Sequence, residues 1–135
     1  MEQPAGNKIT GNPSSHPALS VKWVEDFPDI PLNRNEAYKL RVTSKGVEIE
    51  AITETGVYRA IQTLRQLTEK KGNGIAITGC EITDWPAFRI RGFMQDVGRT
   101  YISTDELKRE IAILARYKIN VFHWHLTENQ AWRLQ

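Results

Sequence analysis

The feature that most constrains the fold of this chain is a change of hydrophobic pattern after Pro86. A short apolar run, Gly92 to Val97, precedes Ser103-Thr104-Asp105-Glu106 and apolar residues at helical spacing, and a second apolar run covers Ile119 to Thr127. Ser103 and Glu106 have the spacing of a capping box, which predicts the start of a helix. A strand, a helix and a strand in this order predict parallel strands joined by a right-handed crossover, as in α/β sheets and barrels.

A different pattern precedes Pro86. Apolar and polar residues alternate on both sides of a turn at Ser44-Lys45-Gly46, which predicts an antiparallel hairpin. Helical spacing follows over 57–67, with Arg59 expected on the exposed side, and the glycines of 72–74 are expected to end this helix before a further strand. Residues 21–86 therefore predict a small α+β domain, in which a small antiparallel sheet packs with a helix.

Composition narrows the class of protein. The apolar content of 40% and charged content of 25% are typical of a globular chain, whereas residues 1–20 are rich in Pro, Gly, Ser and Asn and predict a flexible lead-in. The 18 basic and 16 acidic residues are spread without runs of like charge, so we expect no nucleic-acid partner. No membrane span or signal peptide is expected, and the single Cys80 cannot form an intrachain disulfide.

The stretch NVFHWHLTENQAW, residues 120–132, concentrates unusual side chains. In a strand, Phe122, Trp124 and Leu126 would share one face, and His123 and His125 the other. Two histidines alone do not complete a zinc site, because a catalytic zinc needs a third protein ligand. We therefore expect no metal and predict neutral, hydrogen-bonded interior histidines, with a small zinc protein as an alternative reading.

Two motifs carry a family resemblance. The pattern RGFMQDVGR followed by NVFHWHLTENQAW resembles the opening of the catalytic barrel of glycoside hydrolase family 20, the β-N-acetylhexosaminidases. Residues 36–67 resemble the small α+β domain that precedes that barrel. The resemblance implies that 87–135 form the first βαβ portion of an incomplete (β/α)8 TIM barrel. It also implies removal of terminal N-acetylglucosamine or N-acetylgalactosamine from glycans with retention of configuration, by attack of the sugar's own acetamido group and without a cofactor.

The resemblance implies roles for several residues. Arg91 matches the arginine that binds the sugar's 3- and 4-hydroxyls, although it precedes its strand and barrel active sites lie at the opposite, C-terminal end. Glu128 stands where most members have aspartate, in a network that reaches the catalytic acid through a histidine further along the chain. Asp96 and Arg99 are expected to pair with each other and to support the site.

The remaining aromatic and histidine side chains are expected to support the site as well, namely His123, His125 and Trp132. Trp132 is either a sugar-stacking platform or a hydrophobic plug, and we expect the plug because large aromatic residues usually serve packing.

The catalytic Asp-Glu pair of the family is expected beyond residue 135, because a closed barrel needs roughly 200 to 250 residues. Asp105-Glu106 is explained by the helix start instead. We therefore expect the chain alone to be an inactive fragment whose uncovered apolar strand face promotes self-association. The alternative is a free-standing module that binds glycan or protein without catalysis. Family members often act in the periplasm, outside the cell or in lysosomes, but no compartment is predicted here.

Overall fold

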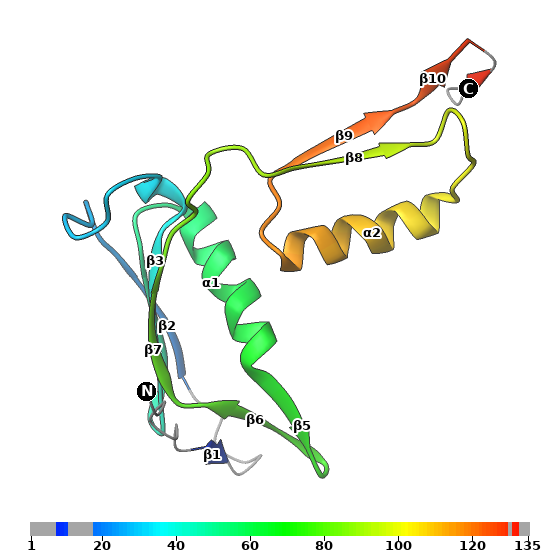
Figure 1. The fold of residues 1–135 in the computed structure, drawn as a ribbon. Helices are drawn as coiled ribbons and strands as arrows, with labels where there is room; N and C mark the ends of the chain where they lie inside the picture. Colours follow the sequence, from blue (N-terminus) through cyan, green and yellow to red (C-terminus); the bar gives the residue numbers. More distant parts are fainter. Residues whose placement is uncertain (1–7, 11–17, 130, 133–135) are drawn as a thin grey trace, which may run out of the picture. The chain divides into compact units, whose positions relative to one another are not determined.

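The protein is described by a computed structural model that covers residues 8–10, 18–129 and 131–132 (Figure 1). The chain divides into two compact units, Met1–Ala87 and Phe88–Gln135, which we call the small unit and the βαβ unit. Among the described residues, neither helix has the length and apolar character needed to cross a bilayer.

The main sheet of the small unit contains four strands in the order β2-β4-β3-β7. The predicted hairpin is confirmed: β3 and β4 are antiparallel and meet at a turn before Gly46. The sheet is mixed rather than purely antiparallel, because β2 runs parallel to β4. The strand bounds are Ala18–Trp23 for β2, Tyr38–Thr43 for β3, Gly46–Ala51 for β4 and Cys80–Asp84 for β7.

Helix α1, Glu54–Leu67, covers one face of this sheet. The helix begins after Thr53, whose side chain accepts a hydrogen bond from the amide of Gly56 and so caps the helix start. Alternation along β3 and β4 directs one apolar row toward the helix, and burial of that row stabilises the fold. The buried core consists of Tyr38, Leu40, Val42, Val47, Ile49 and Ala60.

Arg59 is buried, which corrects the prediction that it lies on the exposed side of the helix. Its Nε and Nη2 both lie 2.9 Å from Oε2 of Glu36, in the 3-10 helix Arg34–Glu36. The cause is a close approach: a Cβ on Gly56 would lie only 2.5 Å from the carbonyl oxygen of Ala37, so α1 packs tightly against this segment. Helical periodicity cannot reveal such a contact, because it depends on a distant segment.

A second sheet of the small unit has the order β1-β6-β5. Its strands are β1 Lys8–Thr10, β5 Thr68–Lys71 and β6 Gly74–Thr78. Helix α1 ends at Leu67 and passes directly into β5, so the glycines of 72–74 form the turn of a β-hairpin and do not end the helix as predicted. Gly72 adopts a φ of 58°, the left-handed conformation that such a turn requires.

The expected flexible lead-in over 1–20 contains strand β1 and the first residues of β2. Strand β2 adds to β4 at a point where Gly46 has a φ of 148° and a Cβ would lie 2.4 Å from the carbonyl oxygen of Ala18. Edge strands of this kind are held mainly by backbone hydrogen bonds, which explains why a polar segment without apolar periodicity forms them.

The βαβ unit confirms the strand, helix and strand predicted after Pro86. Strands β8, Gly92–Asp96, and β9, Val121–His125, are parallel, and helix α2, Thr104–Arg116, connects them (Figure 1). The capping box is present: the Ser103 hydroxyl accepts from the Glu106 amide, and the Glu106 carboxylate accepts from the Ser103 amide. The continuation of this unit into a (β/α)8 barrel stays a prediction.

Beyond β9 the chain forms a small antiparallel pair, β10 Thr127–Glu128 and β11 Ala131–Trp132. The two parallel strands leave apolar side chains accessible. Phe93 stacks on Phe122 with ring centroids 6.4 Å apart, and Trp124 is 47% exposed.

Candidate active site

The candidate site lies at the carboxyl ends of β8 and β9. Asp96 and His125 are the last residues of the two strands and stand opposite each other in register. Arg99 lies in the turn after β8. Glu128 is the last residue of β10, three residues after His125. Parallel strands thus bring together four charged or titratable side chains that are far apart in sequence.

Arg99 bridges the two carboxylates of the site. Its Nη2 lies 2.8 Å and its Nε 3.3 Å from Oε1 of Glu128, and its Nε lies 3.1 Å from Oδ2 of Asp96. The expected pairing of Arg99 with Asp96 is therefore present. The pairing of Arg99 with Glu128 was not predicted.

Asp96 also shapes the turn that carries Arg99. Its Oδ1 accepts hydrogen bonds from the amides of Gly98, at 2.9 Å, and Arg99, at 3.1 Å. These backbone donors, together with the charge of Arg99, lower the pKa of Asp96. The amide of Val97 donates to the carbonyl of His125 at 3.0 Å, which extends the strand pairing to the start of the turn.

The electrostatics favour a charged pair. The hydrogen bond from Arg99 lowers the pKa of Glu128, and the charge of Arg99 acts in the same direction. Glu128 in turn raises the pKa of Arg99. The carboxylate and the guanidinium are therefore both ionised around neutral pH.

The two histidines, predicted to be neutral, hydrogen-bonded interior residues, differ in their exposure. His123 is exposed, and its ring centroid lies 6.4 Å from that of His125. His125 is half-buried, with Nε2 3.3 Å from Oε1 of Glu128 but without a hydrogen bond of acceptable geometry to any described residue. Two strands alone cannot enclose this face, so His123 stays accessible, whereas Nε2 of His125 is buried.

Asp96, His125 and Glu128 have potential metal-ligating atoms within 4.8 Å of one another. His123, half of the alternative zinc pair, is not part of this group. The guanidinium of Arg99 already forms ion pairs with both carboxylates. A divalent ion would have to displace that cation, and we assign no metal to the site.

Arg91 lies at the other end of the same strands. Its guanidinium donates to the carbonyls of Lys118 and Phe88, each at 2.8 Å, and its amide donates to Oδ1 of Asn120 at 2.8 Å. The length of β8 separates it from Glu128, roughly 16 Å at about 3.3 Å per residue. The structure therefore does not bring Arg91 and Glu128 together, and the contacts of Arg91 join the start of β8 to the segment between α2 and β9.

Trp132 pairs with Thr127 across the β10-β11 hairpin and is 70% exposed. It does not act as a hydrophobic plug among the described residues. Its ring is accessible, as a stacking platform would require.

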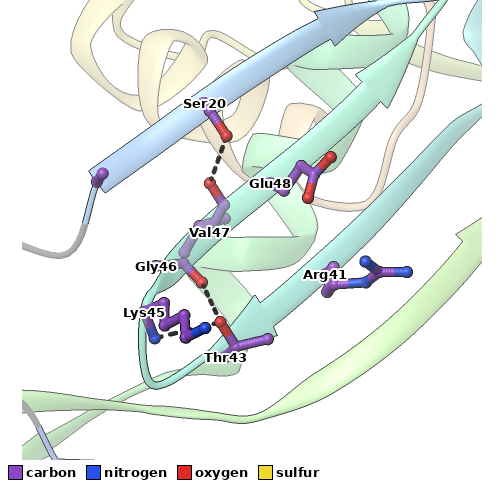
Figure 2. Close-up of a pocket in the computed structure, with 8 residues that line it drawn as sticks. Ser20, Arg41, Thr43, Lys45, Gly46, Val47 and Glu48 are labelled. Atoms are coloured by element: carbon purple, nitrogen blue, oxygen red, sulfur yellow. Dashed lines mark hydrogen bonds between the residues drawn. The ribbon is translucent and has the colours of Figure 1, made fainter.

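The small unit has a cavity of about 330 Å³ at one end of β2, β3 and β4 (Figure 2). Figure 2 shows Ser20, Thr43 and Glu48 around it, together with Arg41, whose Nε lies 2.8 Å from Glu81. None of the described residues that line this cavity is aromatic, so it offers no ring on which a sugar can stack. The cavity gives the alternative of a free-standing glycan-binding module no specific support.

Comparison with known families covers both units. The catalytic domain of glycosyl hydrolase family 20 matches residues 88–135, and domain 2 of the same family matches residues 4–85. The β-hexosaminidase of Porphyromonas gingivalis is 42% identical over 99% of this chain and 16% of its own length. The β-N-acetylhexosaminidase of Cellulomonas fimi is 40% identical over 87% of this chain and 24% of its own length. The chain thus spans less than a quarter of either relative.

Solved structures of family 20 enzymes are similar to this chain as well. The exo-β-N-acetylglucosaminidase of Vibrio harveyi, in complex with N-acetylglucosamine, is 36% identical and superposes with a TM-score of 0.73 over 87% of this chain and 17% of that enzyme. The β-hexosaminidase of Streptomyces plicatus is 33% identical, with a TM-score of 0.72 over 84% of this chain and 23% of that enzyme. The resemblance found in the sequence is confirmed, and the chain belongs to glycosyl hydrolase family 20.

Proposed function

We propose that the whole protein is a retaining β-N-acetylhexosaminidase and that this chain supplies one part of its substrate site. The enzyme would remove terminal N-acetylglucosamine or N-acetylgalactosamine from glycans by substrate-assisted hydrolysis. The observation that carries the proposal is the ion pair of Arg99 with Glu128 at the carboxyl ends of β8 and β9, the end at which barrel enzymes build their active sites.

Arg99, rather than Arg91, is the arginine we assign to the sugar's hydroxyls. Its side chain is 72% exposed, and its contacts with described residues use Nε and Nη2, so the donors on Nη1 face no described acceptor. Arg91 donates from Nε and Nη1 of its guanidinium to two backbone carbonyls at the other end of the strand.

The chemistry of the pair suits recognition of a sugar ring. A guanidinium presents donors in a fixed plane, and an adjacent carboxylate accepts from hydroxyl groups, so together they can bind two neighbouring hydroxyls of one sugar. Because the ion pair already exists, little ordering of either side chain is needed when the sugar binds. Glu128 and Arg99 thus hold the substrate and take no part in bond cleavage.

The bond-breaking groups belong to the rest of the enzyme in this proposal. The adjacent carboxylates Asp105 and Glu106 open α2, and Glu106 accepts hydrogen bonds from the amide and the hydroxyl of Ser103 at 3.0 and 2.7 Å. That arrangement commits Glu106 to the helix start. The chain alone is therefore expected to be inactive.

The test uses the longest natural polypeptide that carries this sequence and a chromogenic N-acetyl-β-glucosaminide. Arg99→Met should lower kcat/KM by about 10- to 150-fold, as expected for loss of hydrogen bonds from a charged group. Arg91→Met is the matched control and should leave kcat/KM nearly unchanged. Absence of turnover by the unmodified enzyme would overturn the proposed activity, and a larger effect of Arg91→Met would overturn the assignment to Arg99.

A further inference from the structure

Gly98, in the turn between β8 and α2, lies next to the aliphatic stem of Glu128, its Cβ and Cγ atoms. A Cβ added to Gly98 would lie 3.3 Å from Cγ and 3.4 Å from Cβ of Glu128, and 3.3 Å from Oδ1 of Asp96. Carbon atoms in ordinary contact are about 3.5 to 4.0 Å apart. The aliphatic stem of Glu128 therefore occupies space that a side chain at position 98 would need.

Gly98 has no backbone reason to be glycine. The described glycines with a positive φ are Gly46 and Gly72, so residue 98 has a conformation that other residues adopt without strain. An alanine there would add one methyl group without straining the backbone. Because any Gly→Ala change also lowers the conformational entropy of the unfolded chain, the effect of the contact is read by comparison with a second Gly→Ala variant.

Hydrogen bonds hold the backbone of this turn in place next to Glu128. Oδ1 of Asp96 accepts from the amides of both Gly98 and Arg99, which holds residues 96–99 in one conformation. The side chain of Glu128 is longer and is held mainly at its carboxylate, by the guanidinium of Arg99. A methyl group at 98 would therefore shift Glu128 rather than the turn.

We propose that Gly98 is a positioning residue for the substrate site: the space above its α-carbon lets Glu128 lie across the turn and deliver its carboxylate to Arg99. A side chain at 98 displaces the stem of Glu128 by a few tenths of an ångström and lengthens the ion pair. The inference rests on the proposed role of Glu128 and Arg99 in binding the sugar.

The first test is a pH titration of the 135-residue chain by NMR, with ¹³C-labelled glutamate and ¹⁵N-labelled arginine. Three charged or titratable groups surround the Glu128 carboxylate, namely Arg99, Asp96 and His125. In the unmodified chain Glu128 should titrate below the ordinary glutamate pKa because Arg99 donates to it. Gly98→Ala should raise this pKa toward the ordinary value and speed hydrogen exchange at Nε of Arg99.

Gly92→Ala is the matched control within the same unit. A Cβ at position 92 would lie 3.9 Å from both Cβ and the carbonyl oxygen of Val121, which is ordinary contact. This variant should leave the titration of Glu128 and the exchange at Arg99 unchanged. The proposal is overturned if the folded Gly98→Ala variant behaves like Gly92→Ala.

A second measurement covers the case in which Gly98→Ala folds poorly. The shift of the urea midpoint caused by Gly98→Ala is measured in the unmodified chain and in Glu128→Ala, which removes the crowded stem beyond Cβ. Most of the shift should disappear in the Glu128→Ala background, and an equal shift in both backgrounds would refute the proposal. None of these readouts requires substrate, so their failure leaves the proposed activity standing. Absence of turnover would leave the effect of Gly98 on the Glu128–Arg99 ion pair standing and would remove its link to a substrate.

Discussion

Arg59 donates from Nε to Oε2 of Glu36 at 2.9 Å, and its Nη2 forms an ion pair with the same oxygen at 2.9 Å, in a contact that joins α1 to the 3-10 helix before β3. The side chain of Arg59 is only 8% exposed. Removal of one partner of a buried ion pair leaves the other charge uncompensated.

The first prediction compares this pair with an exposed one. Glu36→Gln should lower the free energy of unfolding by roughly 3 kcal/mol, near the low end for breaking a buried pair. Lys22→Ala breaks an ion pair with Glu50 in which Lys22 is 62% exposed, and should lower the free energy of unfolding much less, because water screens an exposed pair. Urea unfolding of both variants measures the difference. Equal costs would show that Arg59 finds another acceptor.

The second prediction concerns the hydroxyl of the buried Tyr38. It lies 2.6 Å from Oγ1 of Thr63 on α1 and donates to Oδ2 of Asp84 on β7 at 2.9 Å. Tyr38→Phe removes this link and should lower the free energy of unfolding by about 1 to 3 kcal/mol, since one partner is a carboxylate. Tyr58→Phe, on the exposed side of α1, is the control and should change stability little. Thermal unfolding monitored by circular dichroism compares the two.

The third prediction is a pH dependence of the βαβ unit. Folding lowers the pKa of Glu128 and Asp96, so the ionised carboxylates stabilise the folded state. This contribution is complete above the unfolded-state values, near pH 4, and is lost as the pH falls through the lower folded-state values. Arg99→Met should therefore shift the urea midpoint at pH 7 and have little effect near pH 2. A gap that stays the same at both pH values would contradict this linkage.

The fourth prediction is self-association of the chain. Trp124 on β9 is one of several large apolar side chains that the βαβ unit leaves accessible. Accessible apolar groups of this size favour association. Trp124→Lys should shift sedimentation toward monomer, whereas Ile75→Lys, at an exposed apolar position of the small unit, should not. A monomeric profile of the unmodified chain at high concentration would refute the prediction.

The fifth prediction is that the purified 135-residue chain does not release chromophore from a chromogenic N-acetyl-β-glucosaminide. Its described carboxylates at the site are held by Arg99, and Glu106 is held at the start of α2. The measurement is the initial rate at enzyme concentrations high enough to detect trace turnover. Turnover that co-purifies with the chain and disappears with Arg99→Met would show that the chain is sufficient for hydrolysis.

Local patterns in the sequence predicted the elements whose partners are near in the chain. The hairpin β3-β4 and the capping box of α2 depend on alternation and on a short motif, and both are present. Strand β1 and the parallel pairing of β2 were missed, because an edge strand is selected by the free backbone groups of a distant neighbour. The burial of Arg59 was missed for a similar reason, since Glu36 lies outside the helix.

The candidate site was predicted in composition but not in arrangement. Asp96, Arg99 and Glu128 were all singled out; the sequence resemblance placed the sugar-binding role on Arg91, whereas we propose Arg99 for it. The carboxyl ends of adjacent parallel strands lie at the same edge of a sheet, and this rule alone would have joined Arg99 to Glu128. The contact of Gly98 with Glu128 carried no signal in the sequence, because glycines in turns are common.

Strand β2 packs against β4 at Gly46, where no side chain stands between the two backbones. Any side chain at this position would act as a wedge between Ala18 and the turn, since a Cβ there would lie 2.4 Å from the carbonyl oxygen of Ala18. Gly46 also begins β4 with a φ of 148°, which residues with a side chain rarely adopt. A single substitution at position 46 would therefore strain the hairpin as well as the docking of β2, so both depend on the same residue.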